Sequence, residues 1–151
     1  MLRRPKGTRT AGMEYNCMYE YRVAKVLDVV DGDTIDVQID LGFDVSFTSR
    51  VRLNGIDTPE SRTLDLNEKK LGLEAKFWLK KKLEEAKKIV IRTEKPDSSE
   101  KYGRILATLV INDDPTSLND QMVKAGYAWV YDGGTKHKDF DALLKARVSG
   151  Q

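Results

Sequence analysis

The sequence predicts an α+β fold, in which five strands form a closed or nearly closed barrel and a helix plugs one end of it. Three observations carry this prediction. Runs of β-branched and alternating hydrophobic residues occupy residues 21–53, an amphipathic helical segment follows, and two more short strands precede two shorter helical segments. The 151 residues suit one domain with a hydrophobic core. We divide them into a flexible basic tail at residues 1–20 and a single domain at residues 21–151.

Three strands are expected in the first half of the chain. Tyr21–Val30 is rich in β-branched residues, and Thr34–Leu41 alternates hydrophobic and polar residues, with its last leucine on the apolar face. A third alternating run, Val45–Leu53, includes Phe47 on its apolar face. The remaining two strands are expected at Ile89–Thr93 and Ile105–Ile111.

Three helices are expected in the second half. Gly72–Lys88 places lysines on one part of its surface and carries apolar residues at near-helical spacing elsewhere, as an amphipathic helix does; these are Leu73, Phe77, Leu79, Leu83 and Ala86. Ser117 is a suitable N-cap for a helix that continues to residue 125, where Gly126 follows. A last short helix is expected at Phe140–Val148.

The charges are unevenly distributed along the chain. The whole chain has a net charge of +2, but residues 26–68 hold 3 basic and 10 acidic residues, and residues 69–104 hold 12 basic and 6 acidic residues. A metal site beside a polyanion-binding surface needs such a pairing of an acidic and a basic segment. Ordinary solvated faces of strands and a helix are the alternative explanation.

The composition excludes several classes of site. The single histidine, His137, excludes zinc sites and ribonuclease chemistry that need two histidines, and the single cysteine, Cys17, excludes an internal disulfide. No apolar stretch approaches 18 residues, so we expect no membrane span. No apolar segment follows Arg3 and Arg4, so we expect no signal peptide and an intracellular, cytoplasmic protein.

Carboxylates gather in the polar segments that interrupt the first strands. Asp33, Asp57 and Glu60 offer hard oxygen ligands without nitrogen or sulfur, a set that suits Ca²⁺ or Mg²⁺ rather than zinc. Pro59 fixes a turn between the last two, so backbone carbonyls there can point at an ion. The segment that begins at residue 31 is not an EF-hand, because Asp36 occupies the position that requires glycine.

Two arginines are the expected cationic partners of this site. Arg52 follows a strand residue, and Arg104 follows a glycine in a predicted tight turn. A guanidinium donates paired hydrogen bonds to phosphate oxygens and stays charged at any working pH. Two guanidinium groups and a divalent ion can together neutralise the charge of a phosphorane-like transition state. Either arginine alone would more often form a surface ion pair, so the combination carries the hypothesis.

These segments resemble the staphylococcal nuclease (thermonuclease) family. DGDT at residues 31–34, RLNGIDTPE at residues 52–60 and KYGR at residues 101–104 occur in the family's order, and GLEA at residues 72–75 resembles the start of the family's first helix. The similarity covers roughly residues 21–130. It implies a five-stranded OB-fold barrel with about three helices, and Ca²⁺-dependent hydrolysis of DNA and RNA that releases the 5′-oxygen and leaves 3′-phosphate ends.

The resemblance also implies a role for each matching residue. Asp33 and Asp57 would be carboxylate ligands of Ca²⁺, and Thr58 a backbone carbonyl ligand. Glu60 would activate or orient the attacking water. The remaining positions would bind phosphate: Arg52 and Arg104 at the scissile group, and Lys101 and Tyr102 at a terminal or flanking phosphate.

Some assignments stay open at this point. Tyr127, Trp129 and Tyr131 lie where the family has base-binding aromatics, and either base stacking or core packing would use them. A catalytically silent OB-fold that binds nucleic acid or protein is the main alternative, although all six matching catalytic and metal positions are intact. The unit Glu74-Ala75-Lys76 could indicate another class of metal nuclease, and a plain Ca²⁺-binding module would leave the arginines without a role. We expect a monomer with DNA and RNA as partners; a phage or mobile-element origin is compatible with the sequence.

Overall fold

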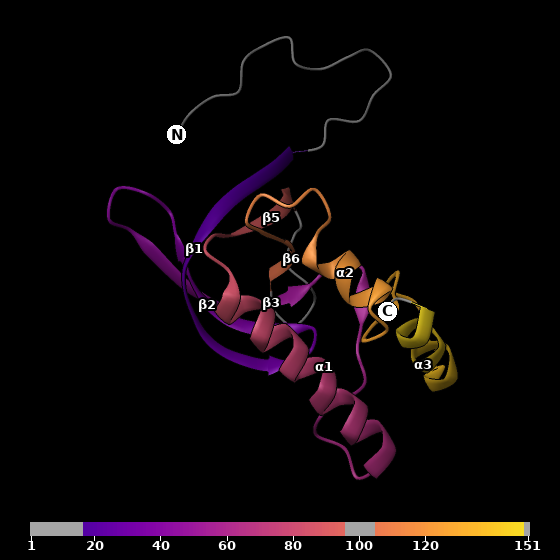
Figure 1. Ribbon diagram of the computed structural model, residues 1–151. Coiled ribbons are helices and arrows are strands. Elements are labelled where there is room, and N and C mark those ends of the chain that lie inside the picture. Colours follow the sequence, from indigo (N-terminus) through magenta and orange to yellow (C-terminus); the bar gives the residue numbers. More distant parts are fainter. Residues whose placement is uncertain (1–16, 96–104, 150–151) are drawn as a thin grey trace, which may run out of the picture.

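The structure, a computed structural model, describes residues 17–95 and 105–149. Within these two ranges five strands form a closed barrel in the order β1-β2-β3-β6-β5, and three helices pack around it, which confirms the predicted α+β OB-fold (Figure 1). The barrel strands are β1 (Cys17–Asp31), β2 (Thr34–Asp40), β3 (Ser46–Leu53), β5 (Ile89–Lys95) and β6 (Ile105–Ile111). The helices are α1 (Leu66–Glu85), α2 (Leu118–Lys124) and α3 (Phe140–Ser149).

The barrel is closed by strands that are distant in sequence. β1, β2 and β3 pair antiparallel in sequence order, and β6 then pairs with β3 in parallel and with β5 antiparallel. β5 completes the ring by pairing with β1 from Cys17 to Arg22. Residues 17–20 therefore belong to the barrel, and not to the tail predicted at residues 1–20. Residues 1–16 lie outside the described part of the chain.

A second, very small sheet was not predicted. β4 (Ile56–Asp57) pairs antiparallel with β7 (Trp129–Val130), and the backbone N–H of Tyr131 donates to the carbonyl of Gly55 at 2.8 Å. Two-residue strands carry no alternation that a sequence pattern could reveal. This sheet ties the segment that follows β3 to the segment that follows α2.

Helix α1 begins earlier than the sequence predicted. The carboxylate of Asp65 accepts hydrogen bonds from the backbone N–H groups of Asn67 at 3.0 Å and Glu68 at 3.3 Å, so it is the N-cap. Gly72, predicted as the first residue, instead lies inside the helix. A Cβ atom there would come within 2.5 Å of the carbonyl carbon of Glu60. The glycine therefore allows the helix to pack closely against the backbone of Glu60, and it does not mark a helix end.

The core lies inside the barrel and beneath it, where α1 crosses the lower end (Figure 1). The inward residues of β2 and β3 are buried as predicted up to Ile39 and from Val51, but Leu41, Val45 and Phe47 are exposed. These three residues belong to the part of the β2–β3 hairpin that extends beyond the barrel (Figure 1). Hydrophobic and polar residues still alternate there, but no core covers the hydrophobic ones. The core side chains are Val23, Val29, Ile35, Val37, Ile39, Val51, Leu53, Ile56, Ala75, Leu79, Leu83, Ile91, Ala107, Leu109, Ile111, Leu118, Met122 and Ala128.

The buried stripe of α1 also differs from the predicted one. The helix buries Leu71, Ala75, Leu79 and Leu83, at a spacing of four residues. Leu73 and Phe77, predicted on the buried face, are exposed. Leu79 and Leu83, predicted on the same face, are buried as predicted. Periodicity alone therefore identified part of the face that meets the barrel.

Gly72→Ala should destabilise the protein although alanine is the better helix former. Alanine gains about 1 kcal/mol in a helix interior, but its Cβ would collide with the backbone of Glu60 and Ser61, and overpacking typically costs roughly 1–3 kcal/mol. Urea denaturation measures the free energy of unfolding. Lys69→Ala, at an exposed position of the same helix, is the control and should change stability little. A more stable Gly72→Ala protein would contradict the close approach.

Candidate active site

The turn between β1 and β2 places Asp33 at the rim of the barrel. Asp31 pairs with Thr34 at the end of the β1–β2 ladder, with Gly32 and Asp33 between them. A Cβ at Gly32 would lie 2.8 Å from the Cβ of Ala75 in α1 and 3.1 Å from the Cγ2 of Thr58. The carbonyl of Asp33 accepts a hydrogen bond from the N–H of Leu53 at 2.8 Å. The turn is therefore fixed from both sides.

Arg52 brings the two aspartates together. Its Nη2 atom lies 3.5 Å from Oδ2 of Asp33 and 3.5 Å from Oδ1 of Asp57. The side chains of Arg52, Asp33 and Asp57 are only 8%, 13% and 7% exposed. Arg52 lies on β3 opposite Thr34, and Asp57 lies in β4, so three separate elements deliver one charged cluster.

The surroundings of Asp33 disfavour its ionised carboxylate. Burial raises the pKa of Asp33 above its ordinary value of 3.8. Arg52 and the hydrogen bond that Thr34 Oγ1 donates to Asp33 Oδ1 at 2.9 Å act in the opposite direction, whereas the neighbouring Asp57 and Asp31 raise the pKa further. A second source of positive charge would therefore favour the ionised carboxylate.

Glu60 lies beside this cluster and faces solvent. Its side chain is 56% exposed, while Thr58 and Pro59 before it are buried. Its backbone N–H donates to Oε1 of Glu68 in α1 at 3.4 Å, and the close approach of Gly72 holds the same segment against that helix. The Glu60 carboxylate is thus free to contact water while its backbone is fixed.

Three further charged residues belong to this site and were missed by sequence reasoning. Lys136 Nζ lies 3.3 Å from Oδ1 of Asp57. Lys138 Nζ donates to Oε1 of the nearly buried Glu68 at 2.7 Å and lies 4.0 Å from Oε1 of Glu60. The hydrogen bond to Glu68 raises the pKa of Lys138. The basic run at residues 136–138 was the available signal, but no motif indicated that this loop folds back over the site.

The structure separates the three aromatic residues whose use was left open. Tyr131 lies beside the site: the Arg52 guanidinium is 5.5 Å and the Lys136 ammonium 5.7 Å from its ring centroid, and its hydroxyl donates to the Gly134 carbonyl at 2.9 Å. Tyr127 stacks on Trp78 with ring centroids 5.6 Å apart, away from these charges. Trp129 packs edge-on against Phe140 but also lines, with Asp57 and Tyr131, a cavity of about 350 Å³.

Three predicted residues, Lys101, Tyr102 and Arg104, lie outside the described residues. The described chain resumes at Ile105, the parallel register partner of Val51, which precedes Arg52.

The oxygen donors of the cluster suit a hard divalent cation. Within the described residues no group of three or more histidine, cysteine, aspartate and glutamate side chains could hold a metal ion, which leaves Asp33 and Asp57 as a two-carboxylate set. Backbone carbonyls such as that of Thr58 would have to complete it. An all-oxygen donor set fits Ca²⁺, which takes 6–8 oxygen ligands including water, better than zinc.

Comparisons with known proteins identify the family of the chain. Residues 50–149 match the family model described as staphylococcal nuclease homologue, and the chain belongs to this family. It is 39% identical over 103 residues to an uncharacterized protein of Bacillus anthracis, covering 68% of this chain and 44% of that protein. It is 34% identical over 113 residues to the SPbeta prophage-derived endonuclease YokF of Bacillus subtilis (73% and 36%) and 34% identical over 111 residues to an uncharacterized endonuclease of Escherichia coli (72% and 60%).

The chain therefore spans less than two thirds of the length of each of these relatives. Among the helices that the structure describes, none combines the length and the hydropathy needed to cross a membrane.

Lys138→Met should destabilise the protein by about 1–3 kcal/mol, because it leaves the Glu68 carboxylate without its charged partner. The raised pKa of Lys138 means that the stabilisation is fully present below 10.5 and is lost as pH rises through the folded-state value. Urea denaturation should thus show a difference in the free energy of unfolding between Lys138→Met and wild type. This difference should have its full size at pH 7 and decrease above pH 10.5. Lys145→Met, at an exposed position of α3, should differ little at any pH; an equal loss there would contradict the pairing.

Proposed function

We propose that this chain is a Ca²⁺-dependent nuclease that hydrolyses phosphodiester bonds of DNA and RNA. The observation that carries the proposal is the convergence of two buried carboxylates on one guanidinium at 3.5 Å each, with an exposed glutamate beside them. Membership of the staphylococcal nuclease homologue family and relatives named endonucleases support a nuclease-like function.

Asp33, Asp57 and the carbonyl of Thr58 would hold the Ca²⁺ ion. When bound, the ion would supply positive charge to the phosphoryl oxygens and offset the two aspartates. This role agrees with the raised pKa of Asp33, whose charge the nearby guanidinium does not fully offset.

Glu60 would accept a hydrogen bond from the attacking water and orient it in line with the phosphorus. Its exposed carboxylate and fixed backbone suit an orienting role more than that of a strong base, since an ionised carboxylate near a cation is weakly basic. The water attacks phosphorus, the bond to the 5′-oxygen breaks, and the products are a 3′-phosphate and a 5′-hydroxyl.

Arg52 would donate to the equatorial phosphate oxygens as their charge increases in the transition state. The two carboxylates at 3.5 Å orient its guanidinium, so little reorganisation is required when the phosphate binds. Arg104 would act as the second donor. Lys101 and Tyr102 would bind a flanking phosphate, and Tyr131, beside Arg52, would stack on a base.

Purified protein should cleave single-stranded DNA, duplex DNA and RNA in Ca²⁺ and lose this activity in EDTA. Glu60→Gln and Arg104→Ala should each lower kcat by several orders of magnitude, because each removes an interaction made in the transition state. The matched controls are Glu85→Gln and Arg62→Ala at exposed positions, which should cleave like wild type.

Circular dichroism establishes that each variant is folded, and sequencing of the ends tests the 3′-phosphate assignment. Undiminished cleavage by Glu60→Gln and Arg104→Ala would reject the catalytic roles. Nucleic-acid binding without any cleavage by the wild type would instead indicate a catalytically silent OB-fold.

Asp33→Asn should raise the Tm of the metal-free protein at pH 7. A raised pKa in the folded state means that the stabilising contribution of Asp33 is fully present below 3.8 and is lost as pH rises through the folded value, so the ionised form opposes folding at neutral pH. Asp36→Asn is the control and should lower the Tm, because the hydrogen bond with Arg50 lowers the pKa of Asp36.

Differential scanning calorimetry in EDTA and in Ca²⁺ makes this measurement. Ca²⁺ should raise the Tm of wild type and of Asp36→Asn and leave Asp33→Asn unchanged. An equal Ca²⁺-induced shift in Asp33→Asn would remove Asp33 from the ligand set.

A further inference from the structure

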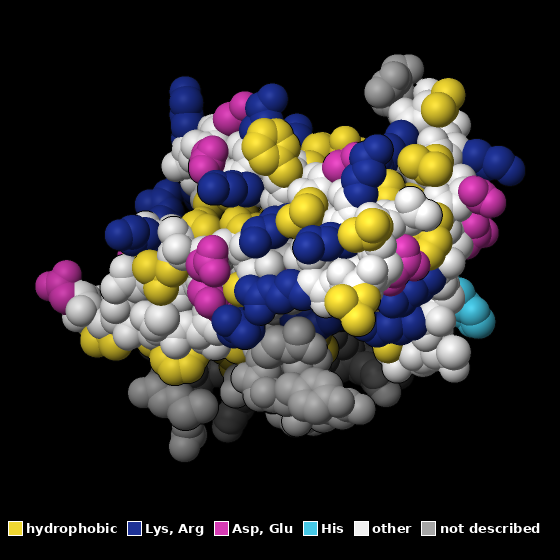
Figure 2. Space-filling model, turned by 90° about the horizontal axis from the view of Figure 1, so that it is seen from below, with side chains coloured by type: hydrophobic (Ala, Val, Ile, Leu, Met, Phe, Trp, Pro, Cys, Tyr) yellow, Lys and Arg dark blue, Asp and Glu magenta, His cyan; other side chains and the backbone are white. Residues whose placement is uncertain are grey.

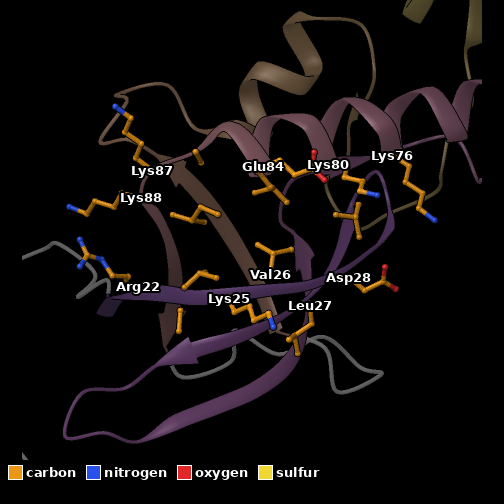
Figure 3. A pocket seen from close by; sticks show the side chains of 16 residues that line it. Arg22, Lys25, Val26, Leu27, Asp28, Lys76, Lys80, Glu84, Lys87 and Lys88 are labelled. Carbon is orange, nitrogen blue, oxygen red and sulfur yellow. The ribbon is translucent and has the colours of Figure 1, made fainter.

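A basic cleft of about 750 Å³ lies between β1 and the C-terminal half of α1. Six basic residues line it, against the two acidic residues Asp28 and Glu84. Figure 3 shows basic side chains at both ends of the cleft, with Asp28 near one of them. The six are Arg22, Lys25, Lys76, Lys80, Lys87 and Lys88.

The cleft exists because β1 separates from β5. β1 pairs with β5 only as far as Arg22, but it continues along β2 to Asp31. Beyond Arg22 no other described strand pairs with the edge of β1 that faces away from β2. Register shifts between Val23 and Lys25 and between Val26 and Asp28 bend the strand along this stretch. The result is an open strand edge lined with cations.

Most of these cations lack a partner among the described residues. Lys88 pairs with Asp113 at 3.0 Å, whereas no ion pair joins Arg22, Lys25, Lys76, Lys80 or Lys87 to another described residue. Like charges held along one cleft repel one another and create a field that attracts a polyanion. Figure 2 shows Lys and Arg side chains interspersed with hydrophobic ones across the face seen from below, where α1 lies.

An apolar groove continues this cleft across α1. Leu66, Leu73 and Phe77 line it, and the Phe77 residue is 69% exposed. Lys76 and Lys80 line both the groove and the cleft, so the two form one surface. An exposed aromatic ring beside rows of lysines matches the requirements of an unpaired nucleic-acid strand, whose bases stack on rings while its phosphates contact cations.

We propose that this surface, the basic cleft with the Phe77 groove, binds a single strand of nucleic acid outside the catalytic cluster. Val29 at one end of the cleft lies two residues before Asp31, and Ala75, which packs against Gly32, adjoins Lys76. A strand held here thus lies near the residues proposed to cleave it. The role of this surface in holding a substrate strand for cleavage rests on the proposed nuclease function, whereas the binding of a single strand does not.

Binding should be measured by fluorescence anisotropy with a labelled 20-nucleotide oligothymidylate in EDTA, where no cleavage occurs. Lys80→Glu/Lys87→Glu should weaken binding at least tenfold and lower the slope of log K against log salt by about 0.7 for each phosphate that the protein no longer neutralises. Lys124→Glu/Lys145→Glu, which makes the same change in net charge at exposed positions elsewhere, should bind within twofold of wild type. Equal weakening of both variants, or of neither, would overturn the proposal.

Phe77→Ala separates stacking from general apolar contact. It should weaken binding about tenfold, while Leu66→Ala in the same groove should have little effect. Equal losses in both variants, or tighter binding of a poly-glutamate peptide of the same charge than of the oligonucleotide, would assign the surface to a protein partner instead.

Hydrolysis of a dinucleotide, too short to reach the cleft, should be unchanged in Lys80→Glu/Lys87→Glu, while KM for a long single strand rises. A loss of dinucleotide hydrolysis would overturn the separation of this surface from the catalytic site. If the wild type cleaves nothing, the nuclease proposal fails, and the anisotropy result still decides the binding surface.

Discussion

The guanidinium of Arg52, between the buried carboxylates of Asp33 and Asp57, is the interaction on which the site depends. Burying a charged cluster is unfavourable, and removing the guanidinium that both carboxylates share would leave them uncompensated, a loss that typically costs about 3–5 kcal/mol for a buried pair. The turn after β1, strand β3 and the short strand β4 must therefore hold their positions for these three side chains to remain together. Burial raises the pKa of Asp33, so a cation bound at this cluster would favour its ionised form, which connects the electrostatics of the fold to the proposed chemistry.

Helix α1 gives the cluster its rigid support. Two glycines lack Cβ atoms where the helix meets the segments that carry Asp33 and Glu60: Gly32 against Ala75, and Gly72 against the backbone of Glu60. The same helix supplies Glu68, which contacts both the backbone of Glu60 and the ammonium of Lys138. Its outer faces carry Lys76, Lys80 and Phe77 of the proposed strand-binding surface. One helix therefore serves the core, the site and the surface through different faces.

The fold class and the order of the long strands followed from local patterns, since alternation and helical periodicity depend on neighbouring residues. The errors occurred where a local pattern does not show which residues the barrel covers. Leu41, Val45 and Phe47 continue the alternation but extend beyond the barrel, and Leu73 and Phe77 have helical spacing on the wrong face of α1. Gly72 suggested a helix start, although its actual role is close packing against a loop distant in sequence.

The sequence by itself determined which side chains are available, among them the carboxylates of Asp33 and Asp57 and the guanidinium of Arg52, and it carried a family resemblance that the comparisons confirm. Only the tertiary structure decided which groups meet. The pairing of β4 with β7 brings Tyr131, Lys136 and Lys138 over the site, and the separation of β1 from β5 opens the basic cleft. Local residue types fix what a side chain can do, whereas long-range strand pairing and helix packing fix what lies within reach of it.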